Sequence, residues 1–183
     1  MNPLEMIKSR RSIRQFEEKG IADETLNQIL EAARWAPSWA NTQCWEVILV
    51  KDPNLKLQLQ QLLTDNNPAA RAMIRAPVII ALCGKLETSG FYKGRAYTKF
   101  RDWFMYDLGI VTQNISLSAH ALGLGSVVIG AFDHDKAKGL LDIPDGYEIV
   151  SLIPIGYPHK IPAPPKRKEL ADFTHLDRFK VDP

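Results

Sequence analysis

The sequence predicts one domain, spanning residues 1–183, of the α+β or α/β class. Its 183 residues match the usual length of a single domain. Helical and extended segments alternate along the chain without an internal repeat. One extended segment, Pro77 to Cys83, carries apolar residues on both faces, which is typical of a sheet covered on both sides. We therefore expect a central sheet packed between helices.

Composition and charge exclude several classes of protein. Hydrophobic residues make up 45% of the chain and charged residues 24%, which argues against a disordered, collagen-like or coiled-coil protein. The 23 Lys and Arg residues and the 21 Asp and Glu residues give a net charge of only +2. A protein that neutralises nucleic-acid phosphates usually carries a larger basic excess. We therefore expect no nucleic-acid partner.

Capping residues and periodicity predict two helices near the N-terminus. Asn2 suits the N-cap, Pro3 the first helical position and Glu5 the capping box, so a helix is expected over about residues 3–10. A second helix is expected over 23–36, where apolar residues recur at helical spacing until a proline stops it. These apolar residues are Leu26, Ile29, Leu30 and Ala33.

The rest of the chain continues the alternation of helix and strand. The expected elements are a strand over 45–50, a helix opening at Asp52 and Pro53, a strand over 77–83, a helix over 100–122, a strand over 126–129, a helix from Asp133 to Leu141 and a strand over 147–155. Residues 90–99 are polar and aromatic without a period, which predicts a mobile excursion. Five of the twelve prolines fall within 154–165, which predicts an extended arm there and no central strand.

The segment 100–122 is apolar around most of its helical circumference. A helix of this kind must be buried on nearly every side, and one small domain can scarcely surround so long a helix. The sequence therefore predicts that a partner subunit covers part of it.

The cysteines and the hydropathy of the chain bear on its compartment. Cys44 and Cys83 lie far apart and form no Cys-x-x-Cys pair, so neither a zinc ribbon nor a thioredoxin-type motif is available. No apolar segment approaches the ~20 residues that span a bilayer, and no signal-peptide pattern follows Met1. We expect a cytoplasmic protein with reduced thiols and no membrane partner.

Three arginines and a serine fall within residues 10–14. They are Arg10, Arg11, Ser12 and Arg14. Arginine forks match phosphate oxygens and a hydroxyl adds a donor, so the segment suits a monophosphate or polyphosphate. The alternative is a solvated run paired with Glu17, Glu18 and Asp23, and the segment by itself favours that alternative.

The loop over residues 36–45 places polar side chains between two tryptophans. Ser38, Asn41 and Gln43 offer directional hydrogen bonds beside flat apolar walls, which a planar heterocycle with polar edges requires. A capped helix end and a turn, with the tryptophans in the core, would use the same residues. Both interpretations stay open on the loop alone.

Two further motifs are weaker. Gly123 and Gly125 precede a strand, whereas a dinucleotide-binding fingerprint follows a strand and opens a helix, so these glycines are expected to end the long helix. Gly130 would let its backbone approach another group closely. A basic cluster over 164–168 follows the prolines and is typical of a solvated tail.

Motifs of hydrolases and metalloenzymes are missing from the sequence. It contains no Gly-x-Ser-x-Gly elbow, no Walker loop and no metal-spaced His/Glu set. His120 falls on the apolar helix and is expected to be a satisfied core or interface histidine. An enzyme built on this chain would therefore use a bound cofactor and no metal.

Five motifs in this order resemble the FMN-dependent nitroreductase family, from Ile7 to about Phe173. They are Arg10-Arg11-Ser12-Ile13-Arg14-x-Phe16, Ala36-Pro37-Ser38-Trp39-Ala40-Asn41-Thr42-Gln43-Cys44-Trp45, Ala121-Leu122-Gly123-Leu124-Gly125-Ser126, Ile143-Pro144-x-Gly146-Tyr147 and Ile155-Gly156-Tyr157-Pro158. The resemblance implies an α+β fold with a central, mostly antiparallel sheet flanked by helices. It also implies an intertwined homodimer with two FMN molecules at the subunit interface.

The resemblance assigns a set of residues to FMN. The implied cofactor-binding residues are Arg10, Arg11, Ser12, Arg14, Pro37, Ser38, Asn41, Gln43, Ile129, Gly130, Arg167 and Lys168. The arginine segment would grip the phosphate and ribityl region, and the two C-terminal residues would close on the same phosphate. The four loop residues would come from the other subunit. Backbone at 129–130 would lie against the isoalloxazine and donate an N–H near flavin N5, where it would stabilise electron density.

The chain departs from the family pattern at two points. Cys44 stands where the family usually has proline, which loosens a φ restraint without removing a ligand. The chain is also short, so the excursion that covers the substrate is reduced to about Thr88 to Lys99. The implied substrate-pocket residues are Phe91, Tyr92, Tyr97 and Phe100.

The activity implied by the resemblance is that of an NAD(P)H-dependent FMN oxidoreductase. In a ping-pong cycle NAD(P)H would pass hydride to flavin N5 and leave, and a small acceptor such as a nitroaromatic or a quinone would take its place. No side chain is expected to act as a catalytic acid or base. Two alternatives remain: a relative of the same fold that fragments flavin or removes halogen, and a flavin-binding protein without turnover.

Overall fold

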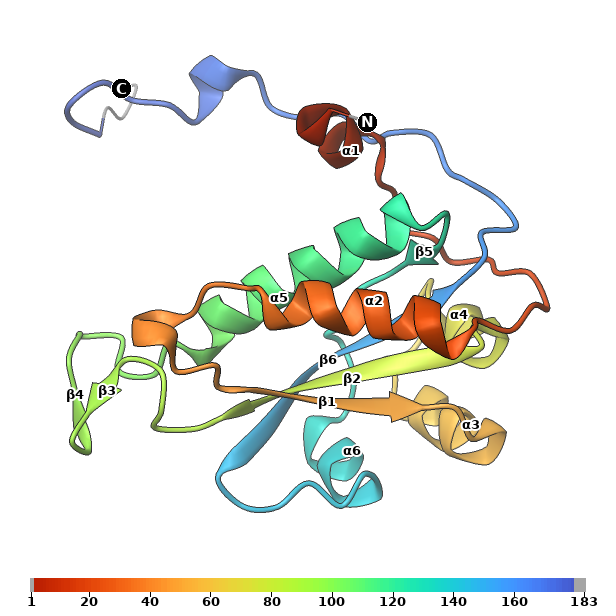
Figure 1. Ribbon diagram of the computed structural model, residues 1–183, viewed down its shortest axis with the longest axis horizontal. Coiled ribbons are helices and arrows are strands. Elements are labelled where there is room, and N and C mark those ends of the chain that lie inside the picture. Colours follow the sequence, from red (N-terminus) through yellow and green to blue (C-terminus); the bar gives the residue numbers. More distant parts are fainter. Residues whose placement is uncertain (1, 180–183) are drawn as a thin grey trace.

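The computed structural model describes residues 2–179, in which one sheet lies between two layers of helices (Figure 1). The helices are α1 (Pro3–Ser9), α2 (Asp23–Arg34), α3 (Pro53–Gln61), α4 (Ala70–Arg75), α5 (Phe104–Ala121) and α6 (His134–Leu140). The strands are β1 (Trp45–Val50), β2 (Val78–Lys85), β3 (Phe91–Tyr92), β4 (Arg95–Ala96), β5 (Gly125–Ser126) and β6 (Tyr147–Gly156). Short 3₁₀ turns lie at Trp39–Asn41 and Leu170–Asp172.

The sheet contains β1, β2, β6 and β5 in that order, and each neighbouring pair is antiparallel. β1 pairs with β2 along its whole length, beginning with Trp45 opposite Gly84. Beyond β5, Ser12 forms a parallel bridge with Ser126, so the N-terminal segment borders this edge of the sheet. The expected α+β class and mostly antiparallel sheet are confirmed.

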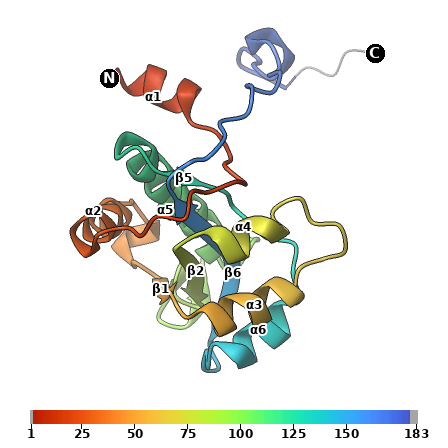
Figure 2. The same ribbon diagram turned by 90° about the vertical axis from the view of Figure 1, so that its right-hand side faces the viewer.

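Helices cover both faces of the sheet, as the apolar pattern of residues 77–83 predicts (Figure 2). The cluster under α2 and α5 includes Leu26, Ile29, Val78, Ile80, Leu82, Leu108, Val111 and Ile115. The cluster under α3, α4 and α6 includes Leu59, Met73, Ile79, Ala81, Cys83, Ala137 and Leu152. Successive residues of a strand point to opposite faces, so β2 supplies both cores.

Side-chain caps begin three of the helices. Asn2 caps α1 and forms a capping box with Glu5. Asp52 caps α3 and Asp133 caps α6, each by accepting a hydrogen bond from the backbone N–H three residues on, at 2.7 and 3.1 Å. These bonds satisfy N–H groups that would otherwise lack an intrahelical partner. The three helices accordingly begin where the sequence predicts.

Pro154 falls within two conflicting expectations, the strand over 147–155 and the extended arm over 154–165, and the structure confirms the strand at this residue. This residue lies within β6, opposite Ile79 of β2. Its carbonyl oxygen accepts the Val127 N–H at 3.4 Å, and a residue of an antiparallel strand directs its N–H and C=O to the same side. The missing N–H therefore faces the short segment 127–129, and the pairing with β2 is undisturbed. The extended arm begins only after Gly156.

Three other boundaries differ from those expected. Residues 90–99, expected to be an excursion without regular structure, contain the β3–β4 hairpin, and their mobility stays a prediction. The strand expected over 126–129 is reduced to β5 and an isolated bridge between Ile129 and Leu152. The sequence does not predict α4, because this six-residue helix has no side-chain cap and is too short to show a period.

The long helix α5 is buried along one side only. Its buried apolar residues are Leu108, Val111, Ile115 and Ala119. On another side, Met105 is 58% and Tyr106 64% exposed. The apolar surface expected all around this helix is thus only partly covered within a single chain.

The C-terminal segment leaves the body of the molecule after His159, whose N–H donates to the Gln15 carbonyl oxygen at 2.9 Å. Residues 160–179, named here the C-terminal arm, project beyond the sheet on the same side as α1 (Figures 1 and 2). The arm's large apolar residues are all exposed. They are Ile161, Leu170, Phe173, Leu176 and Phe179.

Candidate functional site

The arginine segment is positioned by the edge of the sheet. The Ile13 N–H donates to the Ser126 carbonyl oxygen at 2.9 Å. A Cβ at Gly125 would lie 2.4 Å from Ile13 Cγ1, so only glycine permits this close approach. Ile13 is buried while Ser12 and Arg14, on either side of it, reach the surface. The backbone therefore presents these two polar side chains along the β5 edge.

The three arginines of the segment differ in what they contact. Arg10 is half-buried, and its Nε is a buried atom without a hydrogen-bond partner among residues 2–179. Arg11 instead folds back, and its Nη1 donates to the carbonyl oxygens of Lys8 and Arg10 at 2.6 and 2.7 Å. Arg14 is exposed. A buried guanidinium donor without an acceptor is costly, so an anionic ligand would complete Arg10.

His120 lies beside this segment and is satisfied, as predicted. Its Nε2 is 2.7 Å from the Ser9 hydroxyl, which joins α1 to the end of α5. Burial, and then the positive charges of Arg10 and Arg11, lower the pKa of His120. The imidazole therefore adds no further positive charge at neutral pH, and the positive potential here comes from the arginines.

A short distance along the chain, the backbone at Ile129 and Gly130 offers one open donor. The Ile129 N–H donates to the Leu152 carbonyl oxygen at 2.9 Å and is thus occupied by the sheet. The Gly130 N–H has no partner within the described residues, and Gly130 is exposed. A Cβ on Gly130 would meet only the Val150 carbonyl oxygen, at 3.9 Å. Of the two predicted backbone groups, the N–H of Gly130 is the one left open to a ligand.

An open, largely apolar groove of about 590 Å³ borders Gly130. Its walls come from α5, from the segment 128–130 and from β6. Four residues of extended chain, at most about 14 Å, separate Ser126 from Gly130. A ligand with a charged end at the arginine segment and a flat ring at Gly130 fits that spacing.

The loop over residues 36–45 is held in an unusual backbone conformation. Ala40, Asn41 and Gln43 have φ values of 45°, 56° and 49°, which place three non-glycine residues in the left-handed region. The Ser38 hydroxyl accepts the Gln43 N–H at 2.9 Å and helps to hold this shape. Pro37, Asn41 and Gln43 line a cavity of about 480 Å³ at the end of α2. The structure thus brings together three of the four loop residues predicted to bind the cofactor.

The loop and the arginine segment lie apart along the long axis of the molecule. The 3₁₀ turn of the loop is at the left of Figure 1, and β5, which borders the arginine segment, is right of the centre. No hydrogen bond or ion pair among the described residues joins the two. One chain therefore does not assemble both halves of the predicted site around one ligand.

Asp107 anchors the loop, and the sequence motifs do not reveal it. It is 1% exposed, and its carboxylate accepts the Trp39 N–H at 3.1 Å. The same carboxylate accepts the Ser89 hydroxyl at 2.7 Å and lies 3.6 Å from Cys44 Sγ. The available signal was an acidic residue within an apolar helix. Burial, and then the negative charge of Asp107, raise the pKa of Cys44 to about 12, so this thiol stays protonated.

The predicted substrate-pocket residues lie on and beside the β3–β4 hairpin. Tyr92 and Tyr97 make an edge-to-face contact with ring centroids 5.8 Å apart, and both are exposed. Phe91 is half-buried. Phe100 lies farther along, 6.4 Å from the ring of Trp103. The structure therefore presents an aromatic surface here.

The two predicted C-terminal ligands, Arg167 and Lys168, are exposed on the C-terminal arm. Arg167 donates only to the neighbouring Lys166 carbonyl oxygen, at 3.4 Å, and neither residue contacts the arginine segment among the described residues. Their convergence with Arg10 on one phosphate does not occur within a single chain and stays a prediction.

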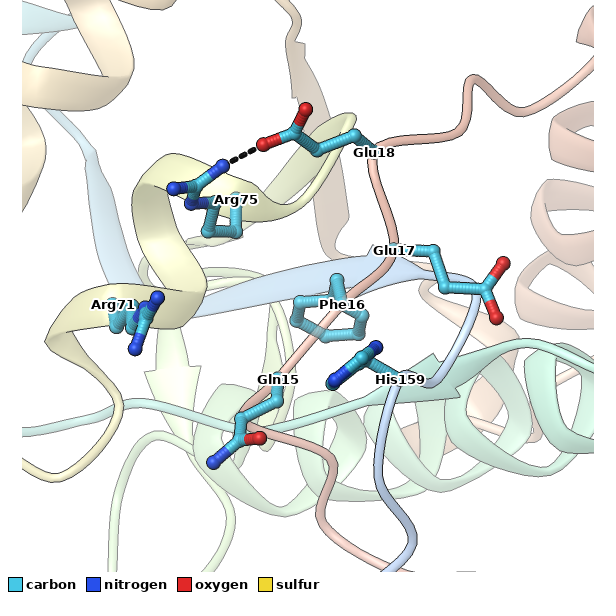
Figure 3. Close-up of a pocket in the computed structure, with 7 residues that line it drawn as sticks. All are labelled: Gln15, Phe16, Glu17, Glu18, Arg71, Arg75 and His159. Carbon is cyan, nitrogen blue, oxygen red and sulfur yellow. Dashed lines mark hydrogen bonds and ion pairs between the residues drawn. The ribbon is translucent and has the colours of Figure 1, made fainter.

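A cavity of about 370 Å³ adjoins the arginine segment at Gln15 (Figure 3). Arg75 of α4 forms an ion pair with Glu18, whereas Arg71, one turn earlier, has no such partner among the described residues (Figure 3). Arg71 adds to the lining of this cavity a cation that the sequence did not identify, because α4 itself was not predicted. No group of three or more His, Cys, Asp or Glu residues able to hold a metal exists within residues 2–179.

The chain is an α+β protein in which Arg10 Nε and the Gly130 N–H lack a partner among the described residues and an apolar groove lies beside the sheet. Comparison with known proteins identifies the family of the chain. Residues 7–157 match the model of the Nitroreductase family, and the chain belongs to the nitroreductase family. None of the helices in the part of the chain that the structure describes is long and apolar enough to cross a membrane.

Individual relatives match the chain over most of its length. A protein of Methanothermobacter thermautotrophicus named as an NADH dehydrogenase/NAD(P)H nitroreductase is 33% identical, over 98% of this chain and 88% of its own. A protein of the same name from Archaeoglobus fulgidus is 32% identical, over 98% and 94%. An FMN-dependent nitroreductase from Clostridium difficile superposes with a TM-score of 0.78 at 26% identity, over 96% of this chain and 99% of its own.

Proposed function

We propose that this chain is an NAD(P)H-dependent FMN oxidoreductase that passes electrons to a small acceptor such as a nitroaromatic or a quinone. The observation that carries the proposal is the buried Arg10 Nε, which has no acceptor among the described residues. A phosphate oxygen would supply that acceptor. Relatives named as NAD(P)H nitroreductases and an FMN-dependent nitroreductase of the same fold support the choice of donor and cofactor.

The residues at the β5 edge fit FMN. Arg10, Ser12 and Arg14 would hold the phosphate and ribityl region, because these alternate residues follow one another beside the β5 edge and the buried Arg10 Nε lacks an acceptor among the described residues. Arg11 would contribute charge more than hydrogen bonds, since its Nη1 is already bonded to backbone. The flat ring would lie in the apolar groove against Gly130. We infer one such FMN-binding domain for each chain.

When bound, FMN supplies the hydride and electron chemistry that no side chain here can perform. The chain's own part is placement and electrostatics. The open Gly130 N–H would donate to a ring nitrogen that becomes electron-rich on reduction. Glycine at this position leaves the ring face clear, since nothing but the Val150 carbonyl oxygen lies near its Cβ position. The arginines would anchor the cofactor and take no part in electron transfer.

The complete site would be assembled by two copies of this chain. Asn41, Gln43 and the Ser38 hydroxyl hydrogen would reach the FMN of the partner, because they lie too far from the β5 edge of their own chain. Exposed apolar residues on α5 and on the C-terminal arm supply the surface that a homodimer would bury. The arm would also carry Arg167 and Lys168 to a phosphate. The cytoplasmic location of the protein stays a prediction.

Anaerobic titration of the FMN-loaded protein tests the proposed function. NADH or NADPH is added, the flavin absorbance is followed, and 4-nitrobenzoate or a quinone is then supplied. We expect bleaching by the nicotinamide and recovery with the acceptor. Binding of FMN without bleaching would identify a flavin-binding protein without turnover. Failure of the apo-protein to bind FMN at all would refute the assignment.

A further inference from the structure

The β3–β4 hairpin and its flanks carry an excess of positive charge that the proposed function does not explain. Residues 88–101 contain four cations and no acidic residue. The cations are Lys93, Arg95, Lys99 and Arg101. The whole chain has a net charge of only +2, so this 14-residue segment carries more positive charge than the protein as a whole.

These four cations are exposed and have no carboxylate partner among the described residues. Three of them lie instead beside aromatic rings: Lys93 is 5.4 Å from the Tyr92 centroid, and Lys99 is 4.9 Å from that of Phe100. Arg101 lies 6.0 Å from the Phe91 centroid. The adjacent Asp102 is engaged by the backbone N–H groups of Glu87 and Phe104. We name residues 88–101 the cationic hairpin.

The cationic hairpin has a defined shape. Lys93 and Gly94 have φ values of 49° and 72°, which are those of the type I′ turn that suits a two-residue hairpin. At its base the Tyr97 N–H donates to the Gly90 carbonyl oxygen at 2.9 Å. The Trp103 indole N–H donates to the Thr98 hydroxyl at 2.7 Å. Its charges and rings are therefore presented from a fixed base.

The base of the hairpin is joined to the loop that would touch the flavin. Asp107 accepts both the Ser89 hydroxyl of the hairpin and the Trp39 N–H of the loop. The rings of Trp39 and Trp103 also pack with centroids 5.1 Å apart. In Figure 1 the β3–β4 hairpin and the 3₁₀ turn of this loop lie next to each other at the left of the molecule. A substrate on a flavin held by the loop would therefore meet the cationic hairpin.

We propose that the cationic hairpin selects substrates that combine a flat ring with negative charge, stacking the ring on its aromatic side chains while its cations attract the anionic group. This inference rests on the proposed function and names the substrate class of that site. Stacking alone would accept neutral rings as readily. Four cations without a carboxylate partner among the described residues add discrimination by charge, which acts over about 10 Å at 0.1 M ionic strength and over a longer range at lower salt.

The test compares anionic with neutral substrates in the FMN-loaded enzyme. The acceptors are 4-nitrobenzoate and its uncharged methyl ester, and the hydride donors are NADH and the uncharged N-benzyl-1,4-dihydronicotinamide. Each half-reaction is measured separately for the wild type and for a variant with Arg95→Gln and Lys99→Gln. That choice spares Lys93 and Arg101, whose backbone lies in the left-handed region. The control carries Lys51→Gln and Lys136→Gln, which remove as much charge from cations already paired with carboxylates.

The quantity compared is the rate constant for the anionic substrate divided by that for its neutral counterpart. Removing two charges about 8 Å from an anion should lower this ratio about fivefold in the hairpin variant at low ionic strength. At about 0.5 M salt the loss should shrink below about twofold. The ratio should fall in the half-reaction with the acceptor or in that with the hydride donor, depending on which of the two anions contacts the hairpin. An unchanged ratio in both half-reactions, or an equal loss in the control, overturns the inference. Because the neutral substrates still report turnover, this result would leave the oxidoreductase itself standing.

Discussion

Replacing the buried Asp107 carboxylate should loosen the loop over residues 36–45, which we propose contacts the flavin. Asp107→Asn keeps the volume but leaves one oxygen to accept hydrogen bonds from the Trp39 N–H and the Ser89 hydroxyl. A hydrogen bond to a charged group contributes about 1.5–3 kcal/mol, and part of this is offset because a charge no longer has to be buried. We expect the free energy of unfolding to fall by about 2 kcal/mol.

The same variant should weaken FMN binding, because the strained φ values at Ala40, Asn41 and Gln43 are held in place by this anchor. Urea unfolding and FMN titration measure the two effects. Ser89→Ala is the matched control, since it removes one donor, spares the Trp39 bond, and should cost about 1 kcal/mol with little change in FMN affinity. Wild-type stability and affinity in Asp107→Asn would refute this account of the loop.

Three further predictions concern the cofactor, the subunit interface and pH. Arg10→Ala or Arg14→Ala should weaken FMN binding about tenfold to a hundredfold with little change in flavin potential, and unchanged affinity in both would contradict the phosphate assignment. Deletion of residues 160–183 should yield monomers in sedimentation experiments, whereas a stable dimer would locate the interface elsewhere. Burial raises the pKa values of Cys44 and Cys83 from 9.0 to about 12 and 11. As the pH rises, the unfolded chain therefore loses these protons before the folded chain does. The free energy of unfolding should fall above about pH 9, by at most about 1.4 kcal/mol per pH unit for each thiol. In a variant with Cys44→Ala and Cys83→Ala this dependence on pH should disappear.

Local signals in the sequence predicted most of the elements, because the interactions that form them are themselves local. Caps at Asn2, Asp52 and Asp133 define helix starts within three residues of sequence. The composition of residues Trp45–Val50 is itself enough to predict a strand. The start of the proline arm at Pro154 was placed too early, although the strand expected over 147–155 already included this residue. The cost of a missing N–H depends on which neighbour it faces, and that is a property of the sheet, not of the residue.

The candidate site was predictable where a motif carries it and hidden where only the fold assembles it. The arginine segment and Gly130 were found from motifs, and their unused donors are consistent with that assignment. Asp107 was not found, since its partners Trp39 and Ser89 are 68 and 18 residues away. Arg71 was missed with the helix that bears it. The positive charge of the hairpin can be counted in the sequence, but only the structure shows that the hairpin lies beside the loop over residues 36–45.

The separation of the loop from the β5 edge also has a genetic consequence. If each flavin takes Arg10 from one chain and Asn41 from the other, then Arg10→Ala and Asn41→Ala proteins are defective in different halves of a shared site. A mixed dimer of the two collects both defects in one site and leaves the other wholly wild type. At an FMN concentration too low to load either variant alone, the two proteins, unfolded and refolded together, should therefore regain about one quarter of the activity of the wild type.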